Sequence, residues 1–354
     1  MTEHACKIDG CDYSGSPQGL RSHLHGRKDD EHVDAAAARR HHDWYPVAYG
    51  LDEEGSDDEG GDEGGETPTE TPTEGPNLDP SQGGSDGEGG DTLDLGDKTL
   101  EFIDAPWLHW PETMFTYFQE EGILFPSDFF GAHIATPKLY ADEFGDDVLK
   151  RAKDYFGEIM MPFRPRAKRA LEELEEYKIN TIAPSHGVIY RNPEKILEAH
   201  RSWTSSEVEE KVLIPYISMW GSTAEMVHVL TESVAAAGVD AVPFDVSSQS
   251  LDNLAGELVD SAGVVFGTPT VLAGPHPQII YIATLAKKLN PPTKYFGVVE
   301  SHGWAGGAVR ELSGLVEGMT GELLGGVEVK GSPGEEDLDR VVELGEKLVE
   351  NIGS

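Results

Sequence analysis

Three short segments in the second half of the chain carry residues suited to holding a phosphate and a flat aromatic ring. Residues 218–223 read SMWGST, residues 267–270 read GTPT and residues 301–307 read SHGWAGG. In the first segment, hydroxyl side chains and the backbone N–H groups of a glycine-containing turn can converge on a phosphate. Trp304 offers an aromatic face, and the glycines beside it allow close backbone approach. No lysine follows the first segment, which excludes a Walker-type loop.

The elements around these segments are expected to form a doubly wound α/β sheet. Apolar runs predict five strands, and a helical pattern follows each of them: the strands are 211–218, 241–246, 262–268, 294–301 and 321–329. Apolar strands separated by helices form parallel sheets that are covered on both faces. The expected strand order is the flavodoxin-like 2-1-3-4-5, which places the three segments at the carboxyl ends of strands 1, 3 and 4, where such folds bind ligands.

A second α/β segment is expected before this sheet. Short strands are predicted at 100–107, 114–118 and 122–125, and another within 179–187. Residues 143–177 have a helical pattern that is interrupted near Met161-Pro162-Phe163, because proline breaks a helix interior.

The order and spacing of these motifs resemble the second half of a flavodiiron protein. The motifs are WLHWPETMFTYFQEEGILFPSDFFG at 107–131, PSHG at 184–187 and the three segments described above. That family joins a metallo-β-lactamase-like di-iron domain to a flavodoxin domain that carries FMN. The resemblance implies FMN contacts from Ser218, Met219, Trp220, Gly221, Ser222, Thr223, Thr268, Pro269, Thr270, Ser301, His302, Gly303, Trp304 and Gly306. His276, in the segment LAGPHPQ, also matches the family and its role is left open, and His228 is interpreted as a helix residue without function.

The resemblance also implies part of a metal site. His109, Asp128 and His186 match late iron ligands of the family, in which Asp128 would bridge two irons and each histidine would cap one. Imidazole and carboxylate ligands suit non-haem iron. The family's early ligands come as HxExDH, and that string is absent; His41-His42-Asp43-Trp44 lacks its glutamate and its register, so we interpret it as coincidence.

We therefore expect an incomplete di-iron site. Three explanations are open: a second polypeptide supplies the missing half-domain, the remnant packs against a dimer partner, or the chain is a decayed fusion.

The two cysteines of the chain lie together near its start and predict a zinc site. Cys6-x4-Cys11 is followed by His23 and then by His25 or His32, a spacing similar to that of C2H2 fingers. We favour Cys6, Cys11, His23 and His32 as ligands. Zinc would fold a segment that is too small to fold alone. Such a finger could bind a protein or DNA, or serve structure only.

Charge and hydropathy restrict the class of protein. The formal net charge is −38, and residues 51–97 hold 17 acidic residues and no lysine or arginine. The tract is expected to be disordered, because it has too few apolar residues to form a core. Strong negative charge disfavours binding to nucleic acid or anionic membranes and suits a high-salt cytoplasm. No apolar run is long enough for a transmembrane helix, and no secretory signal is recognised, so a cytoplasmic protein is expected.

These inferences predict four regions: a C2H2-like zinc finger (1–35), an acidic disordered linker (36–97), a partial metallo-β-lactamase-like domain (98–206) and a flavodoxin-like FMN domain (207–354). The leading hypothesis is an FMN-dependent electron-transfer oxidoreductase. It would receive electrons from a redox partner protein or a flavin reductase, and the resemblance implies a homodimer. No catalytic residue is assigned. The alternative is a regulatory or scaffold protein that uses its zinc finger, with a redox-sensing or inert flavodoxin domain.

Overall fold

The computed structural model describes residues 4–5, 14–15, 90–145 and 147–353. The chain divides into two compact units, Met1–Leu78 and Asp79–Ser354. In the first unit, strands β1 (His4–Ala5) and β2 (Ser14–Gly15) pair antiparallel. The expected zinc ligands Cys6, Cys11, His23 and His32 lie outside the described residues. Everything that follows concerns the second unit.

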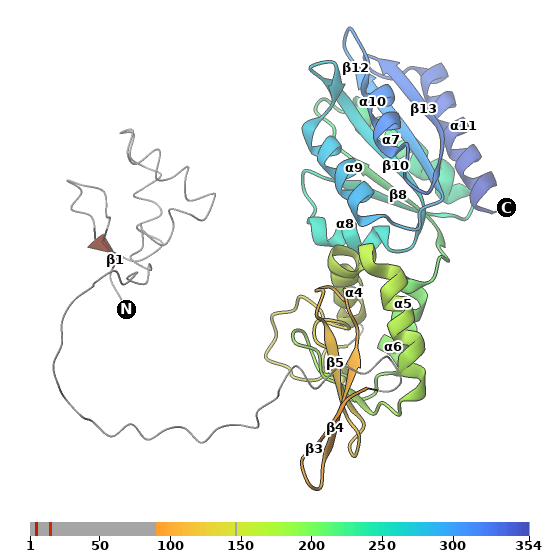
Figure 1. The fold of residues 1–354 in the computed structure, drawn as a ribbon. Coiled ribbons are helices and arrows are strands. Elements are labelled where there is room, and N and C mark those ends of the chain that lie inside the picture. The colour runs from red at the N-terminus through yellow and green to blue at the C-terminus, as the bar shows by residue number, and fades with distance from the viewer. Residues whose placement is uncertain (1–3, 6–13, 16–89, 146, 354) are drawn as a thin grey trace. The chain divides into compact units, whose positions relative to one another are not determined.

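The carboxyl-terminal part of this unit is a parallel sheet of five main strands (Figure 1). Their order is β13-β12-β10-β8-β9, which confirms the expected 2-1-3-4-5 arrangement. The short strand β11 pairs antiparallel with the end of β10. The strands are β8 (Glu209–Tyr216), β9 (Asp240–Asp245), β10 (Ser261–Val271), β11 (Gly274–Pro275), β12 (Tyr295–His302) and β13 (Glu322–Lys330).

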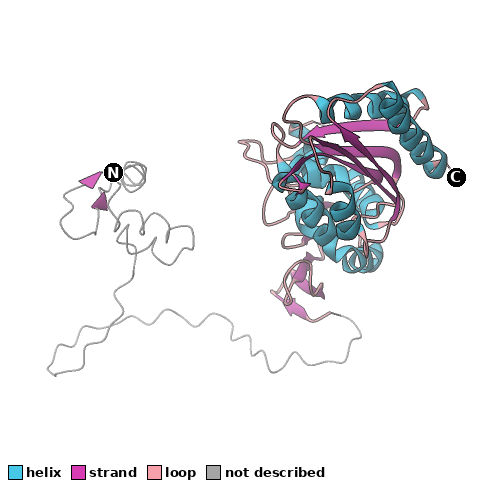
Figure 2. Ribbon diagram, turned by 90° about the horizontal axis from the view of Figure 1, so that it is seen from above, coloured by secondary structure: helices cyan, strands magenta, loops and turns pink. Residues whose placement is uncertain are grey.

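Helices cover both faces of this sheet, as its apolar strands require (Figure 2). One layer contains α7 and α11, which pack against each other, and the other layer contains α8, α9 and α10. The helices are α7 (Ser222–Ala236), α8 (Leu251–Leu258), α9 (Pro277–Leu289), α10 (Ala308–Val316) and α11 (Glu335–Ile352). In the described part of the chain, no helix is long and apolar enough to cross a membrane.

The preceding part has a smaller sheet of order β3-β4-β5-β6-β7. Strands β3 to β6 pair antiparallel, and β6 pairs parallel with β7. Consequently β4, β6 and β7 run in the same direction and end at the same edge of the sheet. The strands are β3 (Thr92–Asp94), β4 (Thr99–Asp104), β5 (Met114–Phe118), β6 (Ile123–Phe125) and β7 (Thr181–Ile182).

Helical segments pack against one face of the smaller sheet. They are η2 (Ala141–Glu143), α4 (Asp147–Tyr155), the π-helix η3 (Phe156–Met160), η4 (Met161–Phe163), α5 (Arg164–Glu173), η5 (Leu174–Glu176) and α6 (Glu194–Thr204). The short 3-10 turn η4 contains Pro162 and confirms the expected interruption of the helical region.

Strand β3 corrects one boundary of the expected organisation. The acidic linker was expected to continue to residue 97, but Thr92–Asp94 forms a strand that pairs with β4. Leu93 stands opposite Leu100, and the turn is closed by Gly96, whose N–H donates to Asp94 Oδ1 at 2.7 Å. Gly96 has a φ of 99°, which glycine adopts easily. The acidic composition of the tract gave no indication that Leu93 would pair in a strand before this turn.

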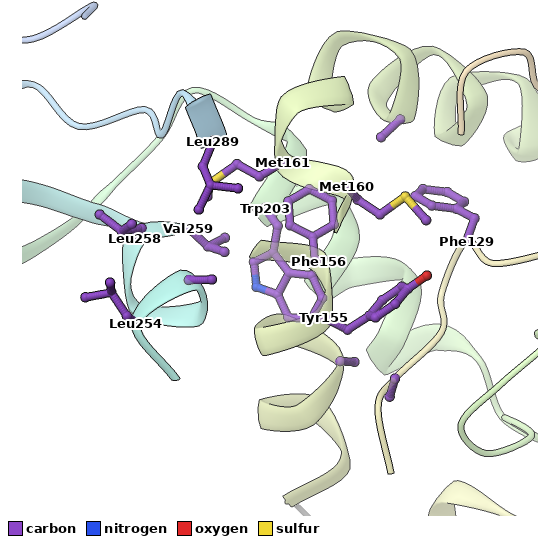
Figure 3. Close-up of a cluster of buried hydrophobic side chains, with 14 of the residues drawn as sticks. Phe129, Tyr155, Phe156, Met160, Met161, Trp203, Leu254, Leu258, Val259 and Leu289 are labelled. Carbon is purple, nitrogen blue, oxygen red and sulfur yellow. The ribbon is translucent and has the colours of Figure 1, made fainter. Parts of the chain in front are cut away.

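The two parts of the unit share a hydrophobic core at their junction (Figure 3). Phe156 and Met161 lie beside Leu258 of α8 and Leu289 of α9, and all four are at most 5% exposed. Gly157 permits this packing, because a Cβ at this position would overlap the carbonyl oxygen of Ala255 in α8. The part with the smaller sheet and the part with the parallel sheet therefore share one continuous hydrophobic core.

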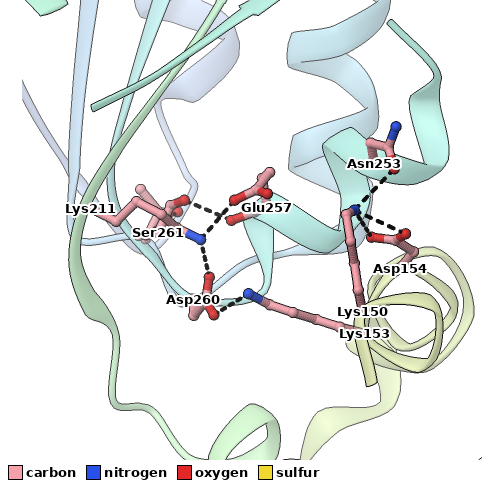
Figure 4. Close-up of polar contacts among 9 residues, drawn as sticks. Lys150, Lys153, Asp154, Lys211, Asn253, Glu257, Asp260 and Ser261 are labelled. Atoms are coloured by element: carbon pink, nitrogen blue, oxygen red, sulfur yellow. Dashed lines mark hydrogen bonds and ion pairs between the residues drawn. The ribbon is translucent and has the colours of Figure 1, made fainter. Parts of the chain in front are cut away.

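Buried charges reinforce the same junction (Figure 4). Asp260 pairs with Lys211 from β8 and with Lys153 from α4, and the Lys211 ammonium also donates to Glu257 Oε2 at 2.9 Å. Burial alone would lower the pKa of Lys211, but the charge of Asp260 and the hydrogen bonds of the cluster raise it above its usual value. The lysine therefore stays charged although it is only 3% exposed.

Candidate functional site

A cavity of about 870 Å³ opens at the carboxyl ends of the parallel strands. Its wall contains residues from all three segments that the sequence singled out. The expected residues that line it are Ser218, Met219, Trp220, Ser222, Thr223, Pro269, Thr270, Ser301, His302, Gly303 and Trp304. The position matches the topological switch point between β8 and β10, where doubly wound sheets bind ligands.

The first loop connects β8 to α7 and has the form of an anion site. Gly221, at φ 96°, turns the chain into the helix and has no side chain to cap it. Ser218 Oγ accepts hydrogen bonds from the N–H groups of Gly221 and Ala224, both at 3.2 Å. The amino end of α7, with Ser222 and Thr223, thus borders the cavity, and the loop contains no lysine or arginine.

Hydroxyl contacts tie the third loop to the first and fix the second loop to the start of α9. Thr223 Oγ1 and Ser301 Oγ are 2.9 Å apart, and both residues are at least nine-tenths buried. Thr268 is fully buried beneath its loop and accepts a hydrogen bond from the N–H of His276 at 2.9 Å. The imidazole of His276 accepts from the N–H of Gln278 and so caps α9. His276 therefore stabilises the start of α9 next to the second loop.

A buried carboxylate, Glu300, organises the third loop. It accepts hydrogen bonds from the N–H groups of Gly307 at 2.9 Å and Val309 at 2.8 Å, and from the hydroxyl of Thr270. Burial alone would raise the pKa of Glu300, but these hydrogen bonds lower it below the usual value. The charged carboxylate thus joins the second and third loops at the start of α10. Glu300 was not predicted as a site residue, because nothing in the local sequence distinguishes it from an ordinary strand residue.

Large apolar side chains stand exposed at the rim of the cavity. Trp220 is 91% exposed, Trp304 is 92% exposed and Leu272 is fully exposed. Leu272 and Ala273 also have positive φ values, 53° and 66°, in the turn between β10 and β11. Exposed indole rings around a cavity at a switch point can cover a flat aromatic ligand and shield it from water. The cavity therefore has the size and lining expected for a flat aromatic ligand that carries a phosphate.

Three of the expected contact residues, Gly221, Thr268 and Gly306, are not among the residues that line the cavity. Six further residues line the cavity: Val271, Leu272 and Ala273 at the end of β10 and in the turn after it, Ala305 in the third loop, and Gly331 and Ser332 after β13. Leu272 and Ala273 lie in the turn of the β10–β11 hairpin. Gly274 was the only residue in the sequence that indicated this hairpin. His228 is exposed on α7 and forms only a pair with Glu232, four residues further along the helix.

The three expected metal ligands also come together. Each follows one of the parallel strands: His109 follows β4, Asp128 follows β6 and His186 follows β7. Asp128 lies between the two imidazoles. Its Oδ2 is 3.3 Å from His109 Nε2, and its Oδ1 is 3.4 Å from His186 Nε2. Two ligand atoms of one metal lie about 3 Å apart when each bond is about 2.1 Å long. The arrangement fits a carboxylate that bridges two metals, with one histidine for each.

This set supplies only half of a di-iron centre. Within residues 90–145 and 147–353, no three His, Cys, Asp or Glu side chains form a group that could hold one metal ion. Each of the two possible metal positions would have one imidazole nitrogen and one oxygen of Asp128 as ligands, whereas iron takes four to six ligands. The residues therefore do not fit a complete di-iron centre by themselves.

Two further side chains contact His186. The hydroxyl of Tyr155 lies 3.2 Å from His186 Nε2, and His133 stacks on the imidazole with ring centres 5.6 Å apart. Burial, followed by the charge of Asp128, raises the pKa of Tyr155, so the phenol keeps its proton. His186 Nδ1 is buried and has no hydrogen-bond partner among the described residues. Helix periodicity alone gave no sign that Tyr155 faces this histidine.

Comparisons with known proteins support both halves of this description. Residues 85–187 match the model of the ODP family beta lactamase. The chain is 35% identical over 269 residues to a nitric oxide reductase of Moorella thermoacetica, a match that covers 74% of this chain and 67% of that protein.

Two solved structures are similar to this chain over about three-quarters of its length. The rubredoxin oxygen:oxidoreductase of Desulfovibrio gigas is 28% identical with a TM-score of 0.72, and the match covers 75% of this chain and 68% of that one. The flavodiiron protein of Giardia intestinalis is also 28% identical, with a TM-score of 0.70 and coverage of 74% and 67%.

Proposed function

Since the chain belongs to the flavodiiron protein family, we propose that it is an FMN-dependent oxidoreductase whose flavin domain receives electrons from a redox partner. The observation that carries the proposal is the cavity formed by three loops at the carboxyl ends of β8, β10 and β12. Its size suits a cofactor as large as FMN, since ligand cavities of this class measure about 300–1,000 Å³. When bound, FMN supplies the electron-transfer chemistry.

The protein contributes binding, orientation and protection from water. The first loop would hold the phosphate through Ser222, Thr223 and the amino end of α7. Thr270, fixed by Glu300, and the third loop would place the ring, and Trp304 would cover it.

His302 is an ionisable side chain in the cavity wall, beside the proposed position of the flavin. His302 pairs with Glu328 through Nε2 at 3.0 Å, while its Nδ1 is buried without a partner in the described structure.

The proposed activity of the chain by itself ends at electron transfer. His109, Asp128 and His186 fit half of a metal centre, so no reaction step is assigned to iron here. Reduction of nitric oxide or oxygen, which the names of two similar proteins imply for those proteins, requires more ligands than these residues provide. We further propose a redox protein or flavin reductase as the electron donor, and a homodimer as the assembly.

Titration with FMN tests the proposal. Flavin fluorescence should be quenched on binding, because indole rings cover the ring system, and the bound flavin should be reduced by a flavin reductase and NADH. Trp304→Ala should weaken binding and restore part of the fluorescence, whereas Trp110→Ala, which removes an exposed tryptophan far from the cavity, should change neither. A chain that binds no FMN after unfolding and refolding with the cofactor would refute the proposal.

A further inference from the structure

The smaller sheet has two apolar faces, although its helices cover only one. Residues that pair across antiparallel strands lie on the same face. The pairs Ile103–Phe115 and Tyr117–Leu124 face the helices, and all four residues are at most 7% exposed. The opposite face carries seven apolar residues, a patch called here the outer face: Leu93, Leu100, Phe102, Met114, Phe118, Ile123 and Phe125. Two polar residues lie on the same side of the sheet, Thr116 within the patch and Asp104 at its edge.

The outer face remains partly open to solvent. Met114 and Phe125 are each 44% exposed, and the remaining members of the face are only half-buried. Trp107 and Trp110, in the loop after β4, are 44% and 58% exposed. A sheet that is meant to face water shows polar residues on that side, and a contiguous apolar patch marks an interaction surface. The sequence of these strands is therefore suited to a second covering layer.

The outer face continues into the incomplete metal site. Phe125 ends β6 only three residues before Asp128, and Met114 begins β5 at the same edge of the sheet. His109 and His186 leave the same edge through β4 and β7. A partner that covers the outer face would therefore reach the open sides of both metal positions.

The relatives indicate what the partner contains. The matches cover about three-quarters of this chain but only 67% to 68% of each related protein, so one third of the relatives' length has no counterpart in the matched region. A second copy of this chain is a poorer candidate. It would bring the same three ligands that the metal positions already have, and not the further ligands that they need.

We propose that the outer face binds a second polypeptide that corresponds to the remaining third of the relatives. It would cover the outer face with an apolar surface and add imidazole and carboxylate ligands to the metal positions at His109 and His186. The proposal concerns a surface remote from the flavin loops and does not depend on FMN binding.

Co-expression tests the proposal. The probe is the polypeptide from the same genome that matches the third of the Moorella nitric oxide reductase left unmatched here. The two chains should co-purify in equal amounts, and the complex should contain two irons that the chain described here lacks alone. Phe125→Gln combined with Met114→Gln should weaken the complex about tenfold or more, as expected when central interface residues are lost. These positions are exposed in the free chain, so the variant should fold.

Two control variants separate the possible causes. Tyr281→Gln, at a 54% exposed aromatic residue on α9, should leave the complex intact. His109→Ala should lower the iron content and preserve the complex. FMN content should be equal in all variants, so that a defect in flavin binding is recognised independently.

Four results would overturn the proposal. They are a genome without such a reading frame, two irons bound by the chain alone, a complex that is insensitive to the Phe125 and Met114 changes, or an outer face already protected from hydrogen exchange in the monomer. Dimerisation of this chain that is lost in the double variant would replace the partner by a second copy.

Discussion

The hydroxyl oxygens of Thr223 and Ser301 lie 2.9 Å apart, although the residues are 78 positions apart in the sequence. This contact joins the loop at the start of α7 to the loop after β12, on opposite sides of β10. Thr223→Val removes one partner and leaves the Ser301 hydroxyl buried, which costs about 1–3 kcal/mol. We expect weaker FMN binding, by about tenfold, in a fluorescence titration. Thr223→Ser retains the hydroxyl and should bind nearly as well; equal binding by the valine variant would contradict the role of the contact.

Glu300 should be needed in its charged form. Its carboxylate accepts from two backbone N–H groups of the third loop and from Thr270. Glu300→Gln keeps the shape but replaces charge-assisted hydrogen bonds, each worth about 1.5–3 kcal/mol, by weaker ones and adds a donor that faces other donors. The variant should unfold at lower urea concentration and bind FMN more weakly. Glu311→Gln, at an exposed residue on helix α10, is the control. A variant with unchanged FMN affinity would show that this anchor does not shape the cavity.

His200 should make stability depend on pH. It is buried among Phe129, Phe130, Phe156 and Trp203, and burial lowers its pKa to about 3. Below its usual pKa of about 6.5, the unfolded chain binds a proton here that the folded chain does not. The free energy of unfolding should therefore fall as pH decreases from about 6.5 towards 3, by up to about 1.4 kcal/mol per pH unit from this residue.

Urea unfolding at several pH values measures this contribution. His200→Gln removes the titrating group and should show a shallower pH dependence than the wild type. His228→Gln, at an exposed histidine, should follow the wild-type slope. Parallel curves for the wild type and His200→Gln would contradict the prediction.

The buried charge cluster should stabilise the junction between the two parts. Asp260→Asn removes the carboxylate that pairs with Lys211 and Lys153. Breaking a buried pair by removing one partner costs about 3–5 kcal/mol, because the other charge stays buried. Glu121→Gln breaks the exposed pair with Lys98 and should cost less than about 1 kcal/mol. If both variants unfold at the same urea concentration, the cluster does not secure the junction.

The sequence predicted the parts of the fold that depend on local pattern. Strand order, helices and the three loops of the cavity followed from apolar periodicity and from glycine and hydroxyl residues at strand ends. The ligands His109, Asp128 and His186 followed from motif resemblance, and their shared edge follows from the direction of β4, β6 and β7.

The features that sequence reasoning missed depend on long-range packing. Glu300 and Tyr155 act through partners on other elements, and neither has a local signal that separates it from ordinary strand and helix residues. Strand β3 was concealed by an acidic composition. The outer face appeared only when strand pairing showed which side chains share a side.

The flavin and iron content of the purified chain is the most direct test of the account. The three complete loops predict one FMN per chain after reconstitution, and the half-set of ligands predicts iron far below two per chain without a partner. Cofactor absorbance and metal analysis on the same sample measure both quantities. A chain that binds no FMN, or one that holds two irons tightly on its own, would contradict the central claim that the flavin site is complete and the metal site is not.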